Sequence, residues 1–233
     1  MAETSEFPLV TGHLSLDLVN TEVSRRGTRH NLLATPQDLM RWLDAVERAG
    51  GLKRESIPQW FGGGRERVEG EGYGESQGES GPQGHGELGE RHGRGGQGHT
   101  PEEQAEIVLD VVLQLRGFLR AGFEVIADGG RPDTGWGEEL ERRVARAPVA
   151  YRVSGGVLVP VPVGSAADAL ASLVALDALQ LLASGELTTL RRCANPDCVL
   201  LFLAENERRK WCSMRLCGNR AKVARHQARM VKP

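Results

Sequence analysis

Apolar residues recur at helical spacing in three stretches of this chain, and each stretch opens with a residue that caps helices. The three capping residues are Thr35, Thr100 and Ser165. Ser and Thr oxygens accept hydrogen bonds from the free backbone N–H groups of a first helical turn. The pattern therefore predicts helices over residues 36–49, 101–128 and 166–183. The third stretch is apolar at nearly every position, so we expect it to be mostly buried.

Shorter elements are expected between these helices. The leucines within residues 12–21 alternate as in a strand and also recur four apart as in a helix, and we favour the helix. Residues 25–31 are typical of a polar loop, and a weaker helix is expected over 138–147. Two apolar runs, 149–153 and 157–162, flank a Ser-Gly-Gly turn and predict a β-hairpin.

Residues 62–99 differ in composition from the rest of the chain. They hold 15 of its 30 glycines, with Glu, Arg, Gln and His between them and almost no apolar residues. Such a segment cannot bury enough surface to offset the entropy that is lost when it becomes ordered. We therefore interpret it as a disordered, glycine-rich insertion within a domain of residues 1–190.

All four cysteines lie near the C-terminus in two pairs with the same spacing: Cys193, Cys198, Cys212 and Cys217. Two short-range pairs suit a tetrahedral zinc ion, whose bonds to sulfur are about 2.3 Å long. The alternative is a redox site or a pair of disulfides. The N-terminus has no apolar signal core, however, and a reducing compartment disfavours structural disulfides. The pattern predicts one structural Zn²⁺ in a closed shell of four thiolates.

The residues around the cysteines predict a small hairpin followed by a helix. An apolar strand over 199–203, a turn and a return strand over 208–211 would bring the second cysteine pair to the first. Gly218 would let backbone amides turn towards a thiolate, and Asn219 would cap the basic helix that follows. We therefore expect a treble-clef-like or ribbon-like zinc module over residues 191–233.

These motifs resemble a known family. The run Arg-Lys-Trp-Cys-Ser-Met-x-x-Cys-Gly-Asn-Arg-x-Lys over 209–222 closely resembles the CGNR zinc finger. Two N-terminal motifs, Leu-Asp-Leu-Val-Asn-Thr at 16–21 and Leu-Leu-x-x-Pro-x-x-Leu-x-x-Trp-Leu at 32–43, are similar to the ABATE domain that accompanies such fingers. The resemblance implies a stress-induced transcription regulator with an ABATE-like regulatory domain over 1–190 and the finger over 191–233. Together with the patterns above, it predicts an α+β fold whose N-terminal domain is mainly helical with a small β-hairpin or sheet.

The charge of the chain is divided unevenly between the two parts. Residues 191–233 contain 11 Lys and Arg against 3 Asp and Glu, a formal charge of +8, while the rest of the chain carries −10. Four thiolates around one Zn²⁺ would lower the first value to about +6. A basic module on an acidic body indicates a polyanionic partner. The alternatives are docking on the chain's own acidic part, or simple solubility.

Eight basic residues of the finger are candidate nucleic-acid contacts: Arg208, Arg209, Lys210, Arg215, Arg220, Lys222, Arg225 and Arg229. Arginine suits phosphates and guanine edges because its planar fork donates two hydrogen bonds at once. We therefore expect DNA as the partner, although the sequence does not separate DNA from RNA. The alternative is a zinc-stabilised protein-interaction module, or a ligand-binding protein, without a nucleic-acid partner.

Two polar residues in the apolar N-terminal stretch, Asp17 and Asn20, are candidates for a small-molecule pocket together with Arg25 and Arg26. The more common role of such residues is to bond nearby backbone groups. The sequence contains no Ser-His-Asp set, phosphate-binding loop or catalytic metal motif, so we expect a regulator rather than an enzyme. A small-molecule effector and a homodimer belong to this hypothesis, since one small finger seldom gives enough affinity alone.

The N-terminus and the hydropathy pattern indicate where the protein acts. The first residues are acidic and lack an apolar signal core, and no apolar run reads as a membrane span. We therefore expect a cytoplasmic protein with no membrane partner.

Overall fold

The computed structural model describes residues 7–25, 27–56 and 99–230, without the side chains of Arg54, Ala224, Arg225, Ala228 and Arg229. The glycine-rich insertion predicted over 62–99 lies outside the described residues, except for His99. The α-helices are α1 (Leu14–Val19), α2 (Pro36–Arg48), α3 (Pro101–Ala127), α4 (Thr134–Arg146), α5 (Ala166–Ser184) and α6 (Asn219–Met230). Three short helical turns are η1 (Arg54–Ser56), η2 (Glu186–Thr189) and η3 (Met214–Gly218).

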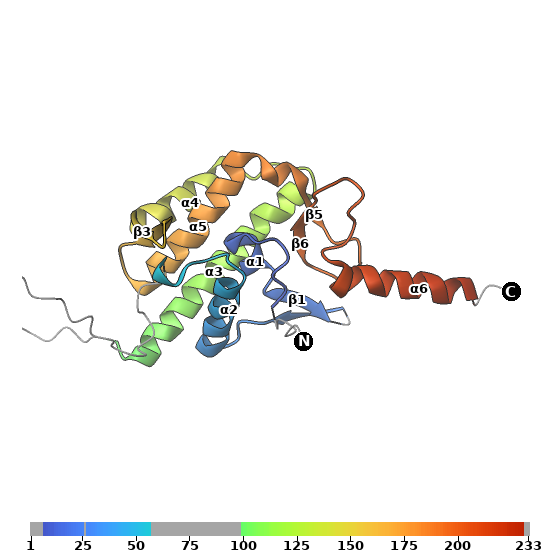
Figure 1. Ribbon diagram of the computed structural model, residues 1–233, viewed down its shortest axis with the longest axis horizontal. Helices are drawn as coiled ribbons and strands as arrows, with labels where there is room; N and C mark the ends of the chain where they lie inside the picture. The colour runs from blue at the N-terminus through green and yellow to red at the C-terminus, as the bar shows by residue number, and fades with distance from the viewer. Residues whose placement is uncertain (1–6, 26, 57–98, 231–233) are drawn as a thin grey trace, which may run out of the picture.

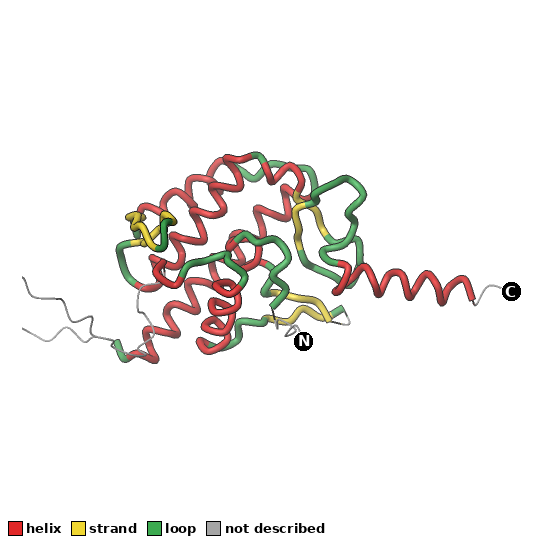
Figure 2. The backbone as a smooth tube through the Cα atoms, viewed as in Figure 1, coloured by secondary structure: helices red, strands yellow, loops and turns green. Residues whose placement is uncertain are grey.

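The strands of the described chain form three separate antiparallel pairs. They are β1 (Glu22–Arg25) with β2 (Thr28–Asn31), β3 (Val149–Ser154) with β4 (Val157–Pro162), and β5 (Leu190–Arg192) with β6 (Leu201–Leu203). Figure 2 shows how far the helices dominate and how small each strand pair is. The predicted mainly helical α+β fold with small sheets is therefore confirmed.

Local sequence signals set the starts of the long helices, as predicted. Thr35 accepts a hydrogen bond from the backbone N–H of Asp38, and the Asp38 carboxylate accepts one from the N–H of Thr35. Thr100 and Glu103 form the same reciprocal box at the start of α3, and the Ser165 hydroxyl caps α5. Each cap satisfies N–H groups that the first helical turn leaves without a partner.

The weaker predictions are confirmed in part. The helix favoured over 12–21 is present as α1, and the hairpin predicted from two apolar runs is β3–β4. The helix predicted over 138–147 begins earlier, at Thr134, because the Asp133 carboxylate accepts a hydrogen bond from the N–H of Trp136 and caps the helix there.

The prediction of a polar loop over residues 25–31 is wrong. β1 and β2 form a ribbon in which Glu22 pairs with Asn31 and Arg25 pairs with Thr28. Gly27 makes the turn with a φ of +80°, a left-handed conformation that favours glycine. All four residues of β2 are exposed, so no alternation of apolar and polar residues marks this strand in the sequence.

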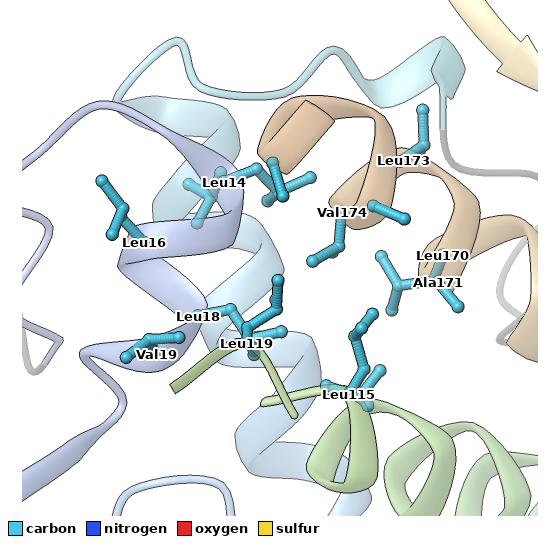
Figure 3. Packing of buried hydrophobic residues seen from close by; sticks show 14 of the residues in the cluster. Leu14, Leu16, Leu18, Val19, Leu115, Leu119, Leu170, Ala171, Leu173 and Val174 are labelled. Carbon is cyan, nitrogen blue, oxygen red and sulfur yellow. The ribbon is translucent and has the colours of Figure 1, made fainter. Parts of the chain in front are cut away.

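The body is built around one apolar core shared by α1, α3 and α5. Figure 3 shows their side chains converging, among them Leu18, Leu119 and Val174. α5 packs against α1, α3 and α4. By length and composition alone α5 could cross a membrane, but 56% of it is buried inside the fold. Burial of this kind is what a core helix requires, as predicted for this stretch.

Gly122 of α3 allows close contact with α4. A Cβ atom at this position would lie 2.2 Å from two ring atoms of Trp136. The Trp136 ring is buried and packs against Phe118 and Phe123, whose ring centroids lie 6.1 and 5.6 Å away. The ring is therefore confined on both sides.

We expect Gly122→Ala to lower the free energy of unfolding by about 3 kcal/mol, because the added methyl group overpacks a confined aromatic ring. Urea denaturation followed by circular dichroism measures this loss. Gly117→Ala is the matched control, since a Cβ atom there would meet no atom within 4 Å. We expect that control to be neutral or to stabilise the helix by up to about 1 kcal/mol. Equal stability of the two variants would contradict the packing argument.

Candidate metal centre and basic helix

The four cysteines come together at one point. The Sγ atoms of Cys193, Cys198, Cys212 and Cys217 all lie within 4.8 Å of one another, and those of Cys198 and Cys212 are 4.0 Å apart. A tetrahedral zinc ion with bonds of about 2.3 Å would hold its sulfur ligands about 3.8 Å apart. The cluster therefore fits one tetrahedral ion.

Hydrogen-bond donors point at two of these sulfur atoms. The backbone N–H of Cys212 donates to Cys193 Sγ, and the side-chain amide of Asn195 donates to Cys217 Sγ, each over 3.5 Å. Donors in the outer shell of a metal site orient its ligands and stabilise their negative charge. The surroundings of the sulfurs therefore suit thiolates.

The mutual influence of the thiols suits a cation. The hydrogen bond with Cys198 lowers the pKa of Cys193, whereas the contact with Cys193 raises the pKa of Cys198 and that of Cys212. Neighbouring thiolates repel one another, so a second negative charge in the cluster is unfavourable. A divalent ion removes this repulsion, and thiol ligands lose their protons when they bind a metal.

The strand pairing of the finger differs from the prediction. The apolar strand is present as β6, but it pairs with β5 and not with residues 208–211, which form no strand. The two halves of the finger meet through a hydrogen bond of 2.8 Å from the N–H of Ala194 to the carbonyl oxygen of Lys210. The prediction of a return strand was wrong because β5, just before the first cysteine, pairs with β6 in its place.

Arg209, predicted as a nucleic-acid contact, instead lies inside the finger. Its guanidinium donates hydrogen bonds to the carbonyl oxygens of Leu203, Trp211 and Cys212. It also lies over the ring of Phe202, 4.8 Å from the centroid. These contacts use the planar fork to hold the chain around the metal centre, so we leave Arg209 out of the candidate nucleic-acid surface.

A capped turn leads from the metal centre into the basic helix. The Ser213 hydroxyl accepts a hydrogen bond from the N–H of Leu216 and caps η3, so the cap predicted at Asn219 lies six residues earlier. Gly218 has no left-handed backbone angle; a Cβ atom there would lie 2.5 Å from the Met214 sulfur. Its role is therefore close packing at the start of α6 and not the predicted turn of backbone amides.

The helix α6 points away from the rest of the protein (Figure 1). Among the described elements, η3 is the one that packs extensively on it. Five of the predicted contacts are exposed: Arg208 and Lys210 before the second cysteine pair, Arg215 in η3, and Arg220 and Lys222 in the first turn of α6. The remaining two, Arg225 and Arg229, belong to α6, but their side chains are outside the described part.

The finger is docked on the body, and Asn20 is one of the residues that hold it. The buried Asn20 side chain donates to the carbonyl oxygen of Leu201 over 2.9 Å and accepts from the N–H of the same residue over 3.0 Å. Leu190 and Leu201, from β5 and β6, belong to the apolar core of the body. The domain boundary predicted between residues 190 and 191 therefore falls inside β5.

Two arginines that were not predicted as site residues complete this junction. The buried Arg120 of α3 donates to the carbonyl oxygens of Val19 over 2.7 Å and Val199 over 3.2 Å, and it pairs with the Glu22 carboxylate over 2.8 Å. Arg192 of β5 forms a bidentate pair with Asp128 at 2.6 and 2.9 Å, which lowers the pKa of Asp128. The position of Arg120 beside the apolar face of α3 was the only sequence signal for its role.

Asp17, the other candidate for a small-molecule pocket, binds the loop before α1. Its carboxylate accepts hydrogen bonds from the N–H groups of Val10, Thr11 and Gly12 and from the Thr11 hydroxyl. Burial raises the pKa of Asp17 to about 6 even though these donors favour the charged form. A cavity of about 870 Å³ lies elsewhere, between the α3–α4 turn, the end of α5 and Arg191. A ligand site at Asp17 and Asn20 stays a prediction.

The fold and the cysteine cluster together define a helical body that carries a C-terminal zinc finger. A family model described as "Putative stress-induced transcription regulator", ABATE, matches residues 12–185, and the CGNR zinc finger matches residues 189–230. The chain therefore belongs to the ABATE family. Its four cysteines are the site of one structural zinc ion. A search of curated proteins found no match to this chain.

Proposed function

We propose that this protein is a transcription regulator that binds DNA through α6 and the exposed basic residues that precede it in the finger. The observation that carries the proposal is the position of α6, a helix of 12 residues that points away from the body and on which, among the described elements, η3 alone packs extensively (Figure 1). Isolated helices of this length are marginal in water. A partner along the helix would stabilise it, and its composition suits an anionic one.

The chemistry of α6 favours a polyanion over an apolar partner. Arg220 and Lys222 are exposed in its first turn, and the helix has no acidic residue. With zinc and four thiolates, residues 191–233 carry about +6 on a chain whose remainder carries −10. An acidic body disfavours nonspecific contact with DNA, so it would restrict binding to the finger.

The zinc ion has a structural part in this mechanism. It would hold Cys217 beside the first cysteine pair and thereby set the direction in which α6 leaves the finger. α6 is about 18 Å long, which is enough to lie along a major groove. Its arginines and lysines would anchor on phosphates, and one or two arginines would read base edges.

Duplex binding over a salt series tests this function. We expect Arg220→Gln/Lys222→Gln to weaken binding and to reduce the slope of log K against log salt by about 1.8, since each lost phosphate contact accounts for about 0.9. Fluorescence anisotropy with random and genomic duplexes measures both values. Arg146→Gln/Arg152→Gln is the matched control, because it removes the same charge from two exposed positions on α4 and β3.

Zinc content is measured in every sample, so that loss of binding is not confused with loss of the finger. If the zinc-loaded wild type does not bind duplex DNA at any salt concentration, the proposal fails. The finger would then be a protein-docking module, and acidic protein surfaces would be its next candidate partners.

Two further parts of this proposal concern assembly and location. A homodimer built by the body would double the contacts of a single small finger and allow two half-sites to be read. Sedimentation that shows only monomer, together with unimpaired specific binding, would remove this part. A cytoplasmic location and control by a small-molecule effector complete the proposed regulator.

A further inference from the structure

The β1–β2 ribbon has an unusual composition for a part of this body. It contains one acidic residue, Glu22, and the strands and turn carry three arginines, so residues 22–31 have a formal charge of +2 where residues 1–190 together carry −10. A two-stranded ribbon is marginally stable by itself. All of β2 is exposed, so the ribbon depends on contacts at its base.

Those contacts come from α3. The Glu22 carboxylate, at the start of β1, pairs with Arg120 over 2.8 Å. The side chain of Asn31, at the end of β2, accepts a hydrogen bond of 2.6 Å from Arg116. Glu22 and Asn31 face each other in the register of the ribbon, so α3 holds both strands at the same level. Arg120 also binds the finger through Val199, which joins ribbon, body and finger at one residue.

The ribbon lies against the metal centre. Val23 of β1 packs on the small core that contains Cys193, Phe202 and Cys212, with Trp211 at its edge. The same core leads through η3 into α6. Figure 1 shows the ribbon and α6 leaving the body on the same side. The metal centre is therefore linked to both projecting elements, through Val23 to the ribbon and through η3 to α6.

The outer half of the ribbon presents cations. Arg25 is exposed at the end of β1 and pairs with Thr28 across the turn. Arg29 is 54% exposed and contacts the Glu22 carboxylate over 3.3 Å, but Arg120 already pairs with that carboxylate more closely. The positive charge of the outer half is thus not balanced by the ribbon's own acid.

We propose that the β1–β2 ribbon is a second DNA-binding element, in which Arg25 and Arg29 contact the phosphates beside those that α6 contacts. The proposal rests on the proposed function, because it places the ribbon on the same duplex as α6. Two-stranded ribbons fit a DNA groove, and arginine side chains bind phosphate oxygens through their planar fork. The ribbon would add contacts that a single short helix lacks, and its base on α3 would keep those contacts in a set position.

The test is duplex binding by Arg25→Gln/Arg29→Gln, measured by fluorescence anisotropy over a salt series with the zinc-loaded full chain. We expect affinity to fall about tenfold at 0.1 M salt and the log–log salt slope to decrease by about 1.8. The single variant Arg25→Gln, which leaves the contact between Arg29 and Glu22 in place, should decrease the slope by about 0.9. Arg146→Gln/Arg152→Gln, which removes the same charge elsewhere, should bind like the wild type.

The outcomes separate this proposal from the function on which it rests. If the α6 variant loses binding while both ribbon variants keep the salt slope and affinity of the wild type, the proposal that the ribbon binds DNA fails. The proposed DNA-binding function of the finger would still hold. No duplex binding by the zinc-loaded wild type would overturn both. A decreased slope in the ribbon variants, with zinc content and circular dichroism unchanged, would support the ribbon as a phosphate contact.

Discussion

Removal of zinc is expected to unfold most of the finger while the body stays folded. The separate core of the finger contains six buried residues, and three of them are the ligands Cys193, Cys212 and Cys217. A core of this size cannot hold a fold without its metal, and structural zinc contributes an apparent 10–16 kcal/mol, roughly, at neutral pH. Leu190 and Leu201, however, belong to the core of the body. We therefore expect the β5–β6 pair to survive.

Hydrogen exchange measured with and without a zinc chelator checks this result. The amides from Cys193 to Val199 and from Ala204 to the end of α6 should lose protection, while those of α3, α5, β5 and β6 keep it. Added zinc should restore the wild type but not Cys212→Ala, which lacks a ligand. Full protection of the finger in the metal-free protein would show that zinc is not structural here.

Arg120→Met is expected to lower the free energy of unfolding by about 3–5 kcal/mol. Methionine keeps much of the volume, but the Glu22 carboxylate loses its close cation and the carbonyl oxygens of Val19 and Val199 lose a donor. Removing one partner from a buried ion pair leaves an uncompensated charge, which is the main reason for so large an effect. Because Val199 belongs to the finger, its docking on the body should loosen as well.

Urea denaturation measures the stability, and hydrogen exchange at β6 measures the docking. Arg116→Met, one turn earlier on the same helix, is the matched comparison. Arg116 donates hydrogen bonds to Thr21 and Asn31, and to no described residue of the finger. We therefore expect a loss of about 1 kcal/mol and no change at β6. A loss below about 1 kcal/mol for Arg120→Met would show that water replaces the guanidinium at little cost.

Local signals explain why the long helices and the zinc ligands could be predicted. A cap such as Thr35 with Asp38 works within four residues, and the apolar face of α2 follows from the helical repeat alone. The paired cysteines are similarly close within each pair, and their chemistry allows few alternatives. These features depend on neighbours along the chain, so they can be predicted from the sequence.

The wrong predictions concern contacts that no cap, repeat or motif of the sequence marks. β1–β2 has no apolar alternation and is held by Arg116 and Arg120, which lie 85 and 98 residues after their partners Asn31 and Glu22. β6 found its partner in β5 and not in the residues that follow it. In the sequence Arg209 is indistinguishable from its exposed basic neighbours, but in the fold its guanidinium binds three carbonyl oxygens. No local pattern distinguishes these cases.

The sequence by itself determined the helix starts, the four zinc ligands, the family and the unequal charge of the two parts. Only the tertiary structure decided how the parts are joined: Asn20 binds the backbone of Leu201, and Arg120 links α1, the ribbon and the finger. It also decided that α6 points away from the body, with η3 as the described element that packs extensively on it. The physical reason is the range of the interactions. Caps, helical repeats and cysteine pairs act between near neighbours, whereas a buried polar group binds whichever distant backbone the folded core brings to it.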